Sequence, residues 1–135
     1  MRLTAFTDYG LRALMRLSGA QDRLFTTDEL AADLQISRNH LTKVVRDLSR
    51  AGYVRTQRGA RGGLRLLRPP QSISLGEVVR FLERRHAIVE CFRTDGGHCT
   101  LTAQCRLKSR LAAAREAFLK ELDATTLAEC AYPGT

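Results

Sequence analysis

The segment between Thr26 and Gly52 constrains the fold of this chain more than any other part of it. Thr26 and Glu29 have the spacing of a capping box, which predicts that a short helix begins there. That helix ends near Gln35, and Ser37 is a suitable N-cap for a second helix. A short helix, a tight turn and a longer helix are together typical of a helix-turn-helix motif.

The second helix of this pair is expected over residues 38–51. Its apolar residues repeat at i, i+3, i+4 and i+7, which predicts one buried stripe: Leu41, Val44, Val45 and Leu48. The opposite face is polar and basic, and it consists of Arg38, Asn39, Thr42, Lys43, Arg46 and Arg50. Side chains near the N-terminus of such a helix reach base edges in the major groove of DNA. We therefore predict that Arg46 and Arg50 hold phosphates, and that bases are contacted by Arg38, Asn39, His40, Thr42 and Lys43.

A β-hairpin is expected directly after this helix. Residues 53–58 and 64–67 are β-like and flank a glycine-rich turn, and Pro69-Pro70 closes the unit. A basic hairpin in this position is a wing. It carries three arginines that can reach phosphates or the minor groove: Arg58, Arg61 and Arg65.

The positive charge of the chain is concentrated in this region. The whole chain carries a net charge of +8, and residues 1–70 account for most of it, with 13 basic and 6 acidic residues. Between Ser37 and Arg68 there are nine basic residues and a single acid, Asp47. This concentration favours a polyanionic partner such as double-stranded DNA, and a solubilising face is the alternative.

The second half of the chain is expected to be helical around one loop. Ser74 and Glu77 have the spacing of a second capping box, which predicts a helix to about Leu82. Residues 86–101 are predicted to form a loop, and Thr102 is expected to cap a long last helix. The narrow apolar stripe of that helix consists of Leu107, Leu111, Ala114, Phe118 and Leu122. Such a stripe favours pairing with a second copy of the chain over packing on its own domain.

Two classes of protein are disfavoured by the sequence. No apolar run approaches the ~18 residues needed to span a bilayer. Asp8 and Arg12 lie where a secretory signal would have to be apolar, so we expect a cytoplasmic protein without a membrane segment. No convergent acid–base or nucleophilic set is evident, and an enzyme is therefore not expected.

Cys91, Cys99 and Cys105 lie within fifteen residues, on a glycine-containing loop that leads into a helix. In a reducing compartment such cysteines are more often metal ligands or redox thiols than disulfides. Soft thiolates suit iron–sulfur clusters and zinc. A tetrahedral zinc ion or a fully protein-ligated cluster needs four ligands, and these cysteines supply three. The fourth would be His98, a distant residue, a solvent species or a group of a partner subunit. Unrelated free thiols are the alternative, and Cys130 is interpreted as an ordinary residue.

Four stretches carry a resemblance to a known family. They are residues 1–14 (MRLTAFTDYGLRAL), 37–45 (SRNHLTKVV), 58–63 (RGARGG) and 99–108 (CTLTAQCRLK). The first three resemble the winged-helix iron–sulfur repressors typified by IscR and NsrR, and the fourth resembles the NsrR branch in particular. The resemblance extends from residue 1 to about residue 130.

This resemblance implies a homodimeric bacterial repressor that binds a near-palindromic operator and releases it when nitric oxide modifies an iron–sulfur cluster. A 4Fe–4S cluster is favoured, and 2Fe–2S is the alternative type. In the NsrR branch the fourth ligand is an aspartate near the N-terminus of the other subunit, and Asp8 occupies that position. IscR-type members have a histidine three residues after the third cysteine, where this chain has Lys108. The implied ligands are therefore Cys91, Cys99 and Cys105 with the partner subunit's Asp8.

The expected architecture is mainly α. A winged helix-turn-helix DNA-binding domain is predicted over residues 1–70, and an iron–sulfur sensor loop with dimerisation helices over residues 71–130. Residues 131–135 are predicted to be a disordered tail. The alternative function is a zinc- or thiol-based redox-sensing DNA-binding regulator without a cluster.

Overall fold

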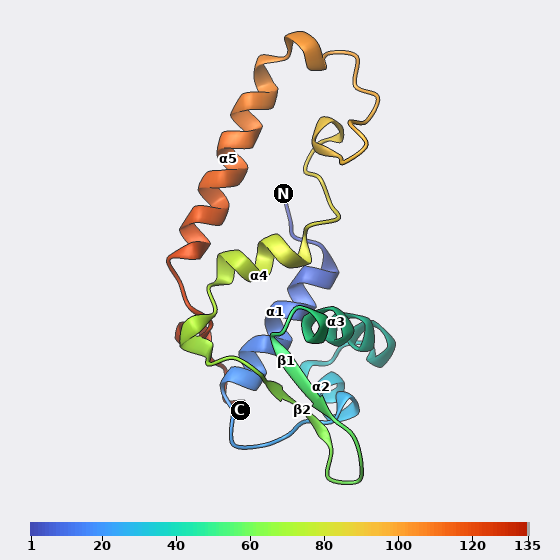
Figure 1. The fold of residues 1–135 in the computed structure, drawn as a ribbon, viewed down its shortest axis with the longest axis vertical. Coiled ribbons are helices and arrows are strands. Elements are labelled where there is room, and N and C mark those ends of the chain that lie inside the picture. Colours follow the sequence, from blue (N-terminus) through green and yellow to red (C-terminus); the bar gives the residue numbers. More distant parts are fainter. Residues whose placement is uncertain (135) are drawn as a thin grey trace.

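Figure 1 shows an elongated molecule in which a compact body carries an arm made of one long helix and one loop. This computed structural model describes residues 1–134. The helices and strands are α1 (Ala5–Ser18), α2 (Thr27–Leu34), α3 (Arg38–Arg50), β1 (Val54–Gln57), β2 (Gly63–Leu66), α4 (Leu75–Leu82) and α5 (Arg106–Asp123). Short 3-10 turns are η1 (Pro70–Ser72), η2 (Glu90–Phe92), η3 (Thr102–Gln104) and η4 (Leu127–Cys130). The predicted fold class, mainly α with a small wing, is confirmed. None of the helices in the described residues is long and apolar enough to cross a membrane.

The helix-turn-helix forms as predicted, with one correction at its first cap. Thr26 accepts a hydrogen bond from the Glu29 backbone N–H (3.1 Å). The Glu29 carboxylate, however, accepts from the Thr26 hydroxyl and from Arg23. The predicted capping box is therefore only half formed, because Arg23 and the hydroxyl occupy the carboxylate. Ser37 caps α3 as predicted by accepting from the His40 backbone N–H (3.3 Å).

The predicted apolar stripe of α3 is buried in the structure. Leu41, Val44 and Leu48 are completely buried, and Val45 is 6% exposed. After the helix, Gly52 adopts φ 82°, a left-handed conformation that favours glycine. This residue turns the chain from α3 into β1.

The hairpin of β1 and β2 forms the predicted wing. Its antiparallel register places Arg55 directly opposite Arg65. On the outer edge of β2, Phe25 and Leu64 exchange two backbone hydrogen bonds of 3.1 and 2.7 Å. The segment between α1 and α2 is therefore fixed alongside the wing.

One hydrophobic core joins the two halves of the sequence. It contains Leu14 of α1, Val44 of α3 and Leu64 of β2 together with Val78 of α4 and Leu127 of η4. Packing is thus continuous across the predicted boundary between residues 70 and 71. The division into a DNA-binding part and a sensor part stays a prediction about function.

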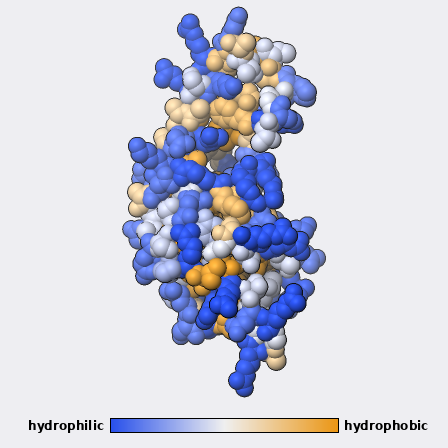
Figure 2. All heavy atoms as spheres, in the orientation of Figure 1, coloured by the Kyte–Doolittle hydropathy of each residue, from blue (hydrophilic) through white to orange (hydrophobic). Residues whose placement is uncertain are grey.

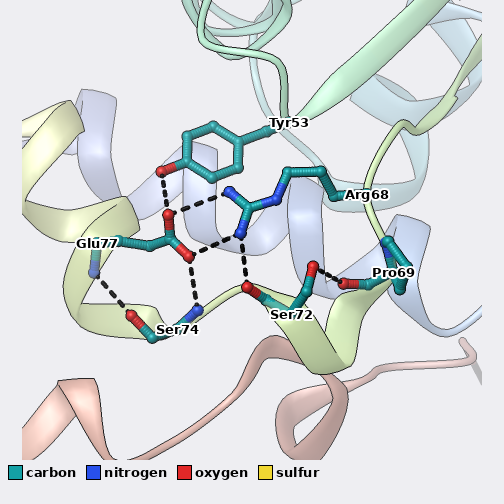
Figure 3. A network of polar contacts seen from close by, with 6 residues as sticks. All are labelled: Tyr53, Arg68, Pro69, Ser72, Ser74 and Glu77. Atoms are coloured by element: carbon teal, nitrogen blue, oxygen red, sulfur yellow. Dashed lines mark hydrogen bonds and ion pairs between the residues drawn. The ribbon is translucent and has the colours of Figure 1, made fainter.

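A polar network attaches the wing to α4 (Figure 3). Ser74 and Glu77 form the complete capping box that the sequence predicts. The Glu77 carboxylate also accepts hydrogen bonds from the Tyr53 hydroxyl (3.2 Å) and from the Arg68 guanidinium (3.1 and 3.2 Å). Burial, together with the nearby Glu77 carboxylate, raises the pKa of Tyr53 to about 12. Burial alone would raise the pKa of Glu77, but the hydrogen bonds from Arg68 and the Ser74 N–H outweigh it and lower that pKa.

The last helix begins later than predicted. Thr102 donates its hydroxyl to the Cys99 carbonyl (3.2 Å) and begins the turn η3. The backbone is then extended at Cys105, which is the N-cap of α5. The prediction that Thr102 caps the long helix is wrong, because its hydroxyl is engaged within the preceding loop.

The long helix α5 is attached to the body near its C-terminal end. Arg80 of α4 forms ion pairs with Glu116 (3.0 Å) and with Asp123, and Leu119 is buried. Of the predicted dimer stripe, Leu107 is 61% exposed and Phe118 is 37% exposed. The other stripe residues are Ala114, which is exposed, and Leu111 and Leu122, which are half-buried. Leu107, Ala114 and Phe118 are therefore accessible in the single chain, and dimerisation stays a prediction.

The tail packs against α1 as far as it is described. The Tyr132 backbone N–H donates to the Met15 carbonyl (2.9 Å), and Arg16 donates to the Pro133 carbonyl (2.9 Å). The predicted disorder is therefore wrong for this part of the tail, because the last turn of α1 provides partners for its backbone. Thr135, which the same prediction included, lies outside the described residues.

Candidate DNA interface and cysteine loop

The N-terminal end of α3 presents the side chains predicted to contact bases. Four of them are exposed, namely Arg38, Asn39, Thr42 and Lys43, and the fifth, His40, is half-buried. Arg38 forms an ion pair with Asp28 of α2, and the Thr42 hydroxyl donates to the Arg38 carbonyl (2.8 Å). The side chains of Arg38 and Asp28 are 64% and 70% exposed, so the pair is weak and can be exchanged for another partner. The sequence pattern does not predict Asp28 as a partner.

His40 differs from its neighbours because its ring packs on α1. The ring lies edge-on to Tyr9 with centroids 4.7 Å apart, and 6.3 Å from the ring of Phe6. Tyr9 follows Asp8 directly in the chain. The side chain of His40 thus links α3 to the helix that carries Asp8, while its predicted contact with DNA stays a prediction.

The side chains predicted to contact phosphates, or in the wing phosphates or the minor groove, lie on α3 and on the hairpin. They are all exposed: Arg46, Arg50, Arg58, Arg61 and Arg65. Among the ion pairs of residues 1–134, none involves these five side chains. On the face seen in Figure 2, most of the body of the molecule is covered by hydrophilic side chains. The charge of these arginines is therefore available to an external polyanion.

Residues 83–85 follow α4 and lead into residues 86–105, the cysteine loop. They connect the start of this loop to α1 and α3. Arg84 donates to the Asp47 carboxylate of α3 at 3.1 Å, and Arg85 lies 3.5 Å from the same oxygen. The Glu83 carboxylate accepts from the backbone N–H and the hydroxyl of Thr4, the N-cap of α1, both at 2.9 Å. The sequence pattern does not predict these contacts. The signal available was Asp47 itself, the single acid in the basic segment.

The three cysteines belong to residues 91–105, a segment that forms the loop of the arm at the top of Figure 1. Cys91 belongs to η2, Cys99 to the irregular segment that follows, and Cys105 is the N-cap of α5. Each is half-buried and has a free thiol. The His98 backbone N–H donates to the Glu90 carboxylate (2.8 Å). This bond joins the residue before Cys91 to the residue before Cys99. It therefore brings together the two ends of the seven-residue segment that separates these cysteines.

Gly97 is required for this closure. It adopts φ 61°, and a Cβ atom added to it would lie 2.6 Å from the Glu90 carbonyl oxygen. Its N–H donates to the Asp95 carboxylate (2.9 Å), which also pairs with Arg93 (2.6 Å). Any side chain at this position would force the two ends of the loop apart.

The ligand set implied by the resemblance is not assembled within one chain. Among the residues described, no three His, Cys, Asp or Glu side chains are placed so that they could hold a metal ion. Asp8 lies on α1 with its side chain 46% exposed, and its carboxylate accepts hydrogen bonds from Arg12 Nε (3.0 Å) and Nη2 (2.7 Å). His98 is exposed in the loop, and Cys130 lies in η4 away from it in the chain.

Comparison with known proteins identifies the family. The sequence pattern of the Rrf2 family, described as iron-dependent transcriptional regulator, matches residues 3–132. The chain belongs to the Rrf2 family. A relative in Geobacillus kaustophilus (strain HTA426), described as HTH-type transcriptional regulator NsrR, is 47% identical to this Rrf2 protein over 131 residues. The match covers 96% of this chain and 88% of the relative.

Solved structures with a similar fold belong to transcriptional regulators as well. IscR of T. potens has a TM-score of 0.73 and 25% identity, and the match covers 95% of this chain and 84% of that one. The oxidized form of Staphylococcus aureus CymR has a TM-score of 0.75 and 26% identity, with full coverage of both chains. CymR of B. subtilis, described as its global cysteine regulator, has a TM-score of 0.70 and 27% identity, with 94% and 93% coverage.

Membership of the Rrf2 family makes this chain a DNA-binding transcriptional regulator. The prediction that it is not an enzyme is confirmed by this membership. The predicted kinship with the IscR and NsrR regulators is confirmed by the 47% identity to an NsrR.

Proposed function

We propose that this Rrf2 protein is a repressor that binds a near-palindromic operator as a homodimer, holds an iron–sulfur cluster and releases DNA when nitric oxide modifies that cluster. The observation that carries the proposal is the 47% identity to an NsrR over almost the whole chain, together with three free thiols on one loop. The family description as iron-dependent supports iron as the metal.

The cysteine loop fits such a cluster by the chemistry of its donors. Cys91, Cys99 and Cys105 are free thiols, and thiolates are the usual protein ligands of iron–sulfur clusters. Cys105 lies at the N-terminus of the 18-residue helix α5, where the helix dipole favours a negatively charged ligand. A bound cluster would supply iron that reacts with nitric oxide.

The partner subunit's Asp8 would complete the ligand set. In the single chain this carboxylate is engaged by Arg12 through two hydrogen bonds. The pair is half-exposed on both sides, so its contribution to stability is small, about 0–1 kcal/mol. Asp8 can therefore exchange Arg12 for another cation at little cost.

Two sets of contacts connect the proposed cluster ligands to α3, the helix predicted to contact bases. Tyr9, next to Asp8, packs on His40 at the start of α3. Arg84, which follows α4 and leads into the cysteine loop, donates a hydrogen bond to Asp47 near the C-terminal end of α3. We infer that release of the ligands from the loop and from Asp8 shifts α3 through these contacts, and so changes the spacing of the two recognition helices in a dimer.

The second candidate is a thiol-based or zinc-based regulator without a cluster. It is favoured by the similarity to CymR, whose solved forms include an oxidized one, and by the same free thiols. Both candidates use the predicted DNA interface, so they differ only in what the cysteines hold.

The test is anaerobic purification followed by measurement of visible absorbance, iron and sulfide per chain, and affinity for an operator selected from random duplexes. The proposal predicts a coloured protein whose operator affinity falls at least tenfold when nitric oxide is titrated. Replacing Cys91, Cys99 or Cys105 with Ala should abolish the colour, and the matched variant Cys130→Ala should retain it. A colourless protein that binds the operator and responds to thiol oxidation or zinc would support the second candidate instead.

A further inference from the structure

Two arginines face each other on the outer face of the wing. The register of the hairpin places Arg55 of β1 directly opposite Arg65 of β2. Side chains in such positions have Cβ atoms roughly 5 Å apart, and like charges there destabilise a hairpin. Both side chains are exposed, and neither is engaged in an ion pair with another residue of the described chain. The wing therefore carries two adjacent positive charges without a counter-charge.

The same two arginines line a shallow pocket of about 240 Å³. Gln21 lines it from the turn after α1, and Leu66 and Leu67 provide its apolar part. No acidic residue contributes to the lining. The Gln21 amide donates to the Ser18 carbonyl (3.3 Å), and the bridge between Phe25 and Leu64 holds this segment beside β2. The three polar side chains are thus brought together by tertiary structure.

We propose that Arg55, Arg65 and Gln21 form a binding site for one phosphate-type oxyanion. Guanidinium groups bind phosphate oxygens through paired hydrogen bonds, and one shared anion would offset the repulsion between the two charges. The amide of Gln21 adds a neutral hydrogen-bonding group to the lining. The sequence pattern does not predict Arg55 as a contact to DNA.

The favoured source of the phosphate is the backbone of bound DNA, since Arg58 and Arg61 lie on the same hairpin. In this form the inference rests on the proposed function. Free phosphate is the other source, and the two are separated by experiments with and without DNA.

With DNA, affinity is measured for the selected operator and for a scrambled duplex over a range of salt concentrations. Arg55→Gln and Arg65→Gln should each weaken both duplexes by the same factor, because a phosphate contact carries no sequence information. Each should reduce the slope of log affinity against log salt by up to about 0.9, the value for one phosphate. The double variant should also lose no more than about 0.9. A loss of about 1.8 would show two independent phosphates and would overturn the shared site.

Lys120→Gln is the matched control. Lys120 is exposed on α5, outside the wing, and the substitution removes the same charge. It should leave the salt slope unchanged, so that a loss of slope in the wing variants is not an effect of net charge.

Without DNA, thermal unfolding is followed in inorganic phosphate and in chloride at equal ionic strength. Phosphate should raise the Tm of the natural chain and of Lys120→Gln more than that of the double variant. In dilute chloride, Arg55→Gln should itself raise the Tm, because it removes the repulsion. A positive result here with unchanged DNA binding would assign the site to a free anion.

Equal stabilisation of the double variant and the natural chain by phosphate, together with unchanged DNA binding, would overturn the proposal. If the chain bound no duplex at all, the proposed function would fail, and the phosphate experiment would still decide the existence of the site.

Discussion

Asp47 of α3 accepts a hydrogen bond from Arg84 across 3.1 Å, although 37 residues separate the two in the chain. Asp47 is 7% exposed, and a buried carboxylate without a cationic partner is costly. The position of the segment that leads into the cysteine loop is therefore coupled to the position of α3, the helix predicted to contact bases. Arg84 is further held by its contact with the Phe81 ring, 4.0 Å from the ring centroid.

The two arginines that face Asp47 are expected to differ in their effect on stability. Arg84→Gln should lower the free energy of unfolding by about 1–2 kcal/mol, because it weakens the partner of a buried carboxylate. Arg85→Gln should cost less than about 0.5 kcal/mol, since its side chain is 67% exposed and its contact is longer. Urea unfolding of both variants measures the difference. Equal losses would show that Arg84 is not the principal partner.

The division of labour on α3 predicts two kinds of DNA-binding defect. Arg38→Ala should reduce discrimination between the operator and a scrambled duplex by ~1–3 kcal/mol, because a bidentate contact with a guanine is lost. Arg50→Ala should weaken both duplexes equally and flatten the salt dependence, as expected for a phosphate contact. Binding measured at several salt concentrations separates the two. Identical defects in both variants would contradict this assignment.

The geometry of the cysteine loop predicts a difference between two neighbouring glycines. Gly96 and Gly97 both have positive φ, so Ala at either position carries backbone strain of roughly 1–3 kcal/mol. Only at Gly97 would the new Cβ clash with Glu90, since the space around Gly96 is open. Gly97→Ala should therefore lose more iron per chain than Gly96→Ala after anaerobic purification. Equal iron content would show that closure of the loop does not matter for loading.

The pair of Asp8 and Arg12 predicts that the two residues have different roles. Asp8→Ala should keep a visible chromophore under anaerobic conditions but change its spectrum, because one ligand is replaced. Arg12→Gln frees the carboxylate without removing it and should leave the spectrum unchanged. Absorbance and circular dichroism in the visible range test both variants. An unchanged spectrum in Asp8→Ala would reduce Asp8 to a carboxylate that stabilises the start of α1.

The network at Glu77 predicts a loss of stability in acid. Its pKa in the folded chain lies below the ordinary value of 4.5. The ionised group therefore contributes stability that is fully present above pH 4.5 and is lost as the pH falls through the folded pKa. Glu77→Gln should lower stability near neutral pH by about 1 kcal/mol and make its decline in acid shallower, with the effect limited by partial exposure. The control Glu121→Gln, at an exposed position on α5, should leave the acid limb of an unfolding curve unchanged.

Local patterns determined much of this fold. The stripe from Leu41 to Leu48 and the caps at Ser37 and Ser74 depend on neighbours within one or two turns, and each was predicted correctly from the sequence. Thr102 shows where this reasoning fails, because a threonine can cap a helix or bond within a loop. Which of the two roles Thr102 takes depends on the path of the preceding loop. The spacing of apolar residues along a helix carries no information on that path.

The sequence by itself determined the basic helix α3, the wing and the three thiols on one loop. The spacing of apolar residues, the residues that favour turns and the type of each side chain are properties of short segments. Only the tertiary structure decided what those groups face. It paired Asp47 with Arg84, placed Tyr9 on His40, and docked the tail on α1. It also set Arg55 against Arg65 by the register of the wing. Partners of charged and aromatic side chains come from distant parts of the chain, and burial in one common core brings those parts together.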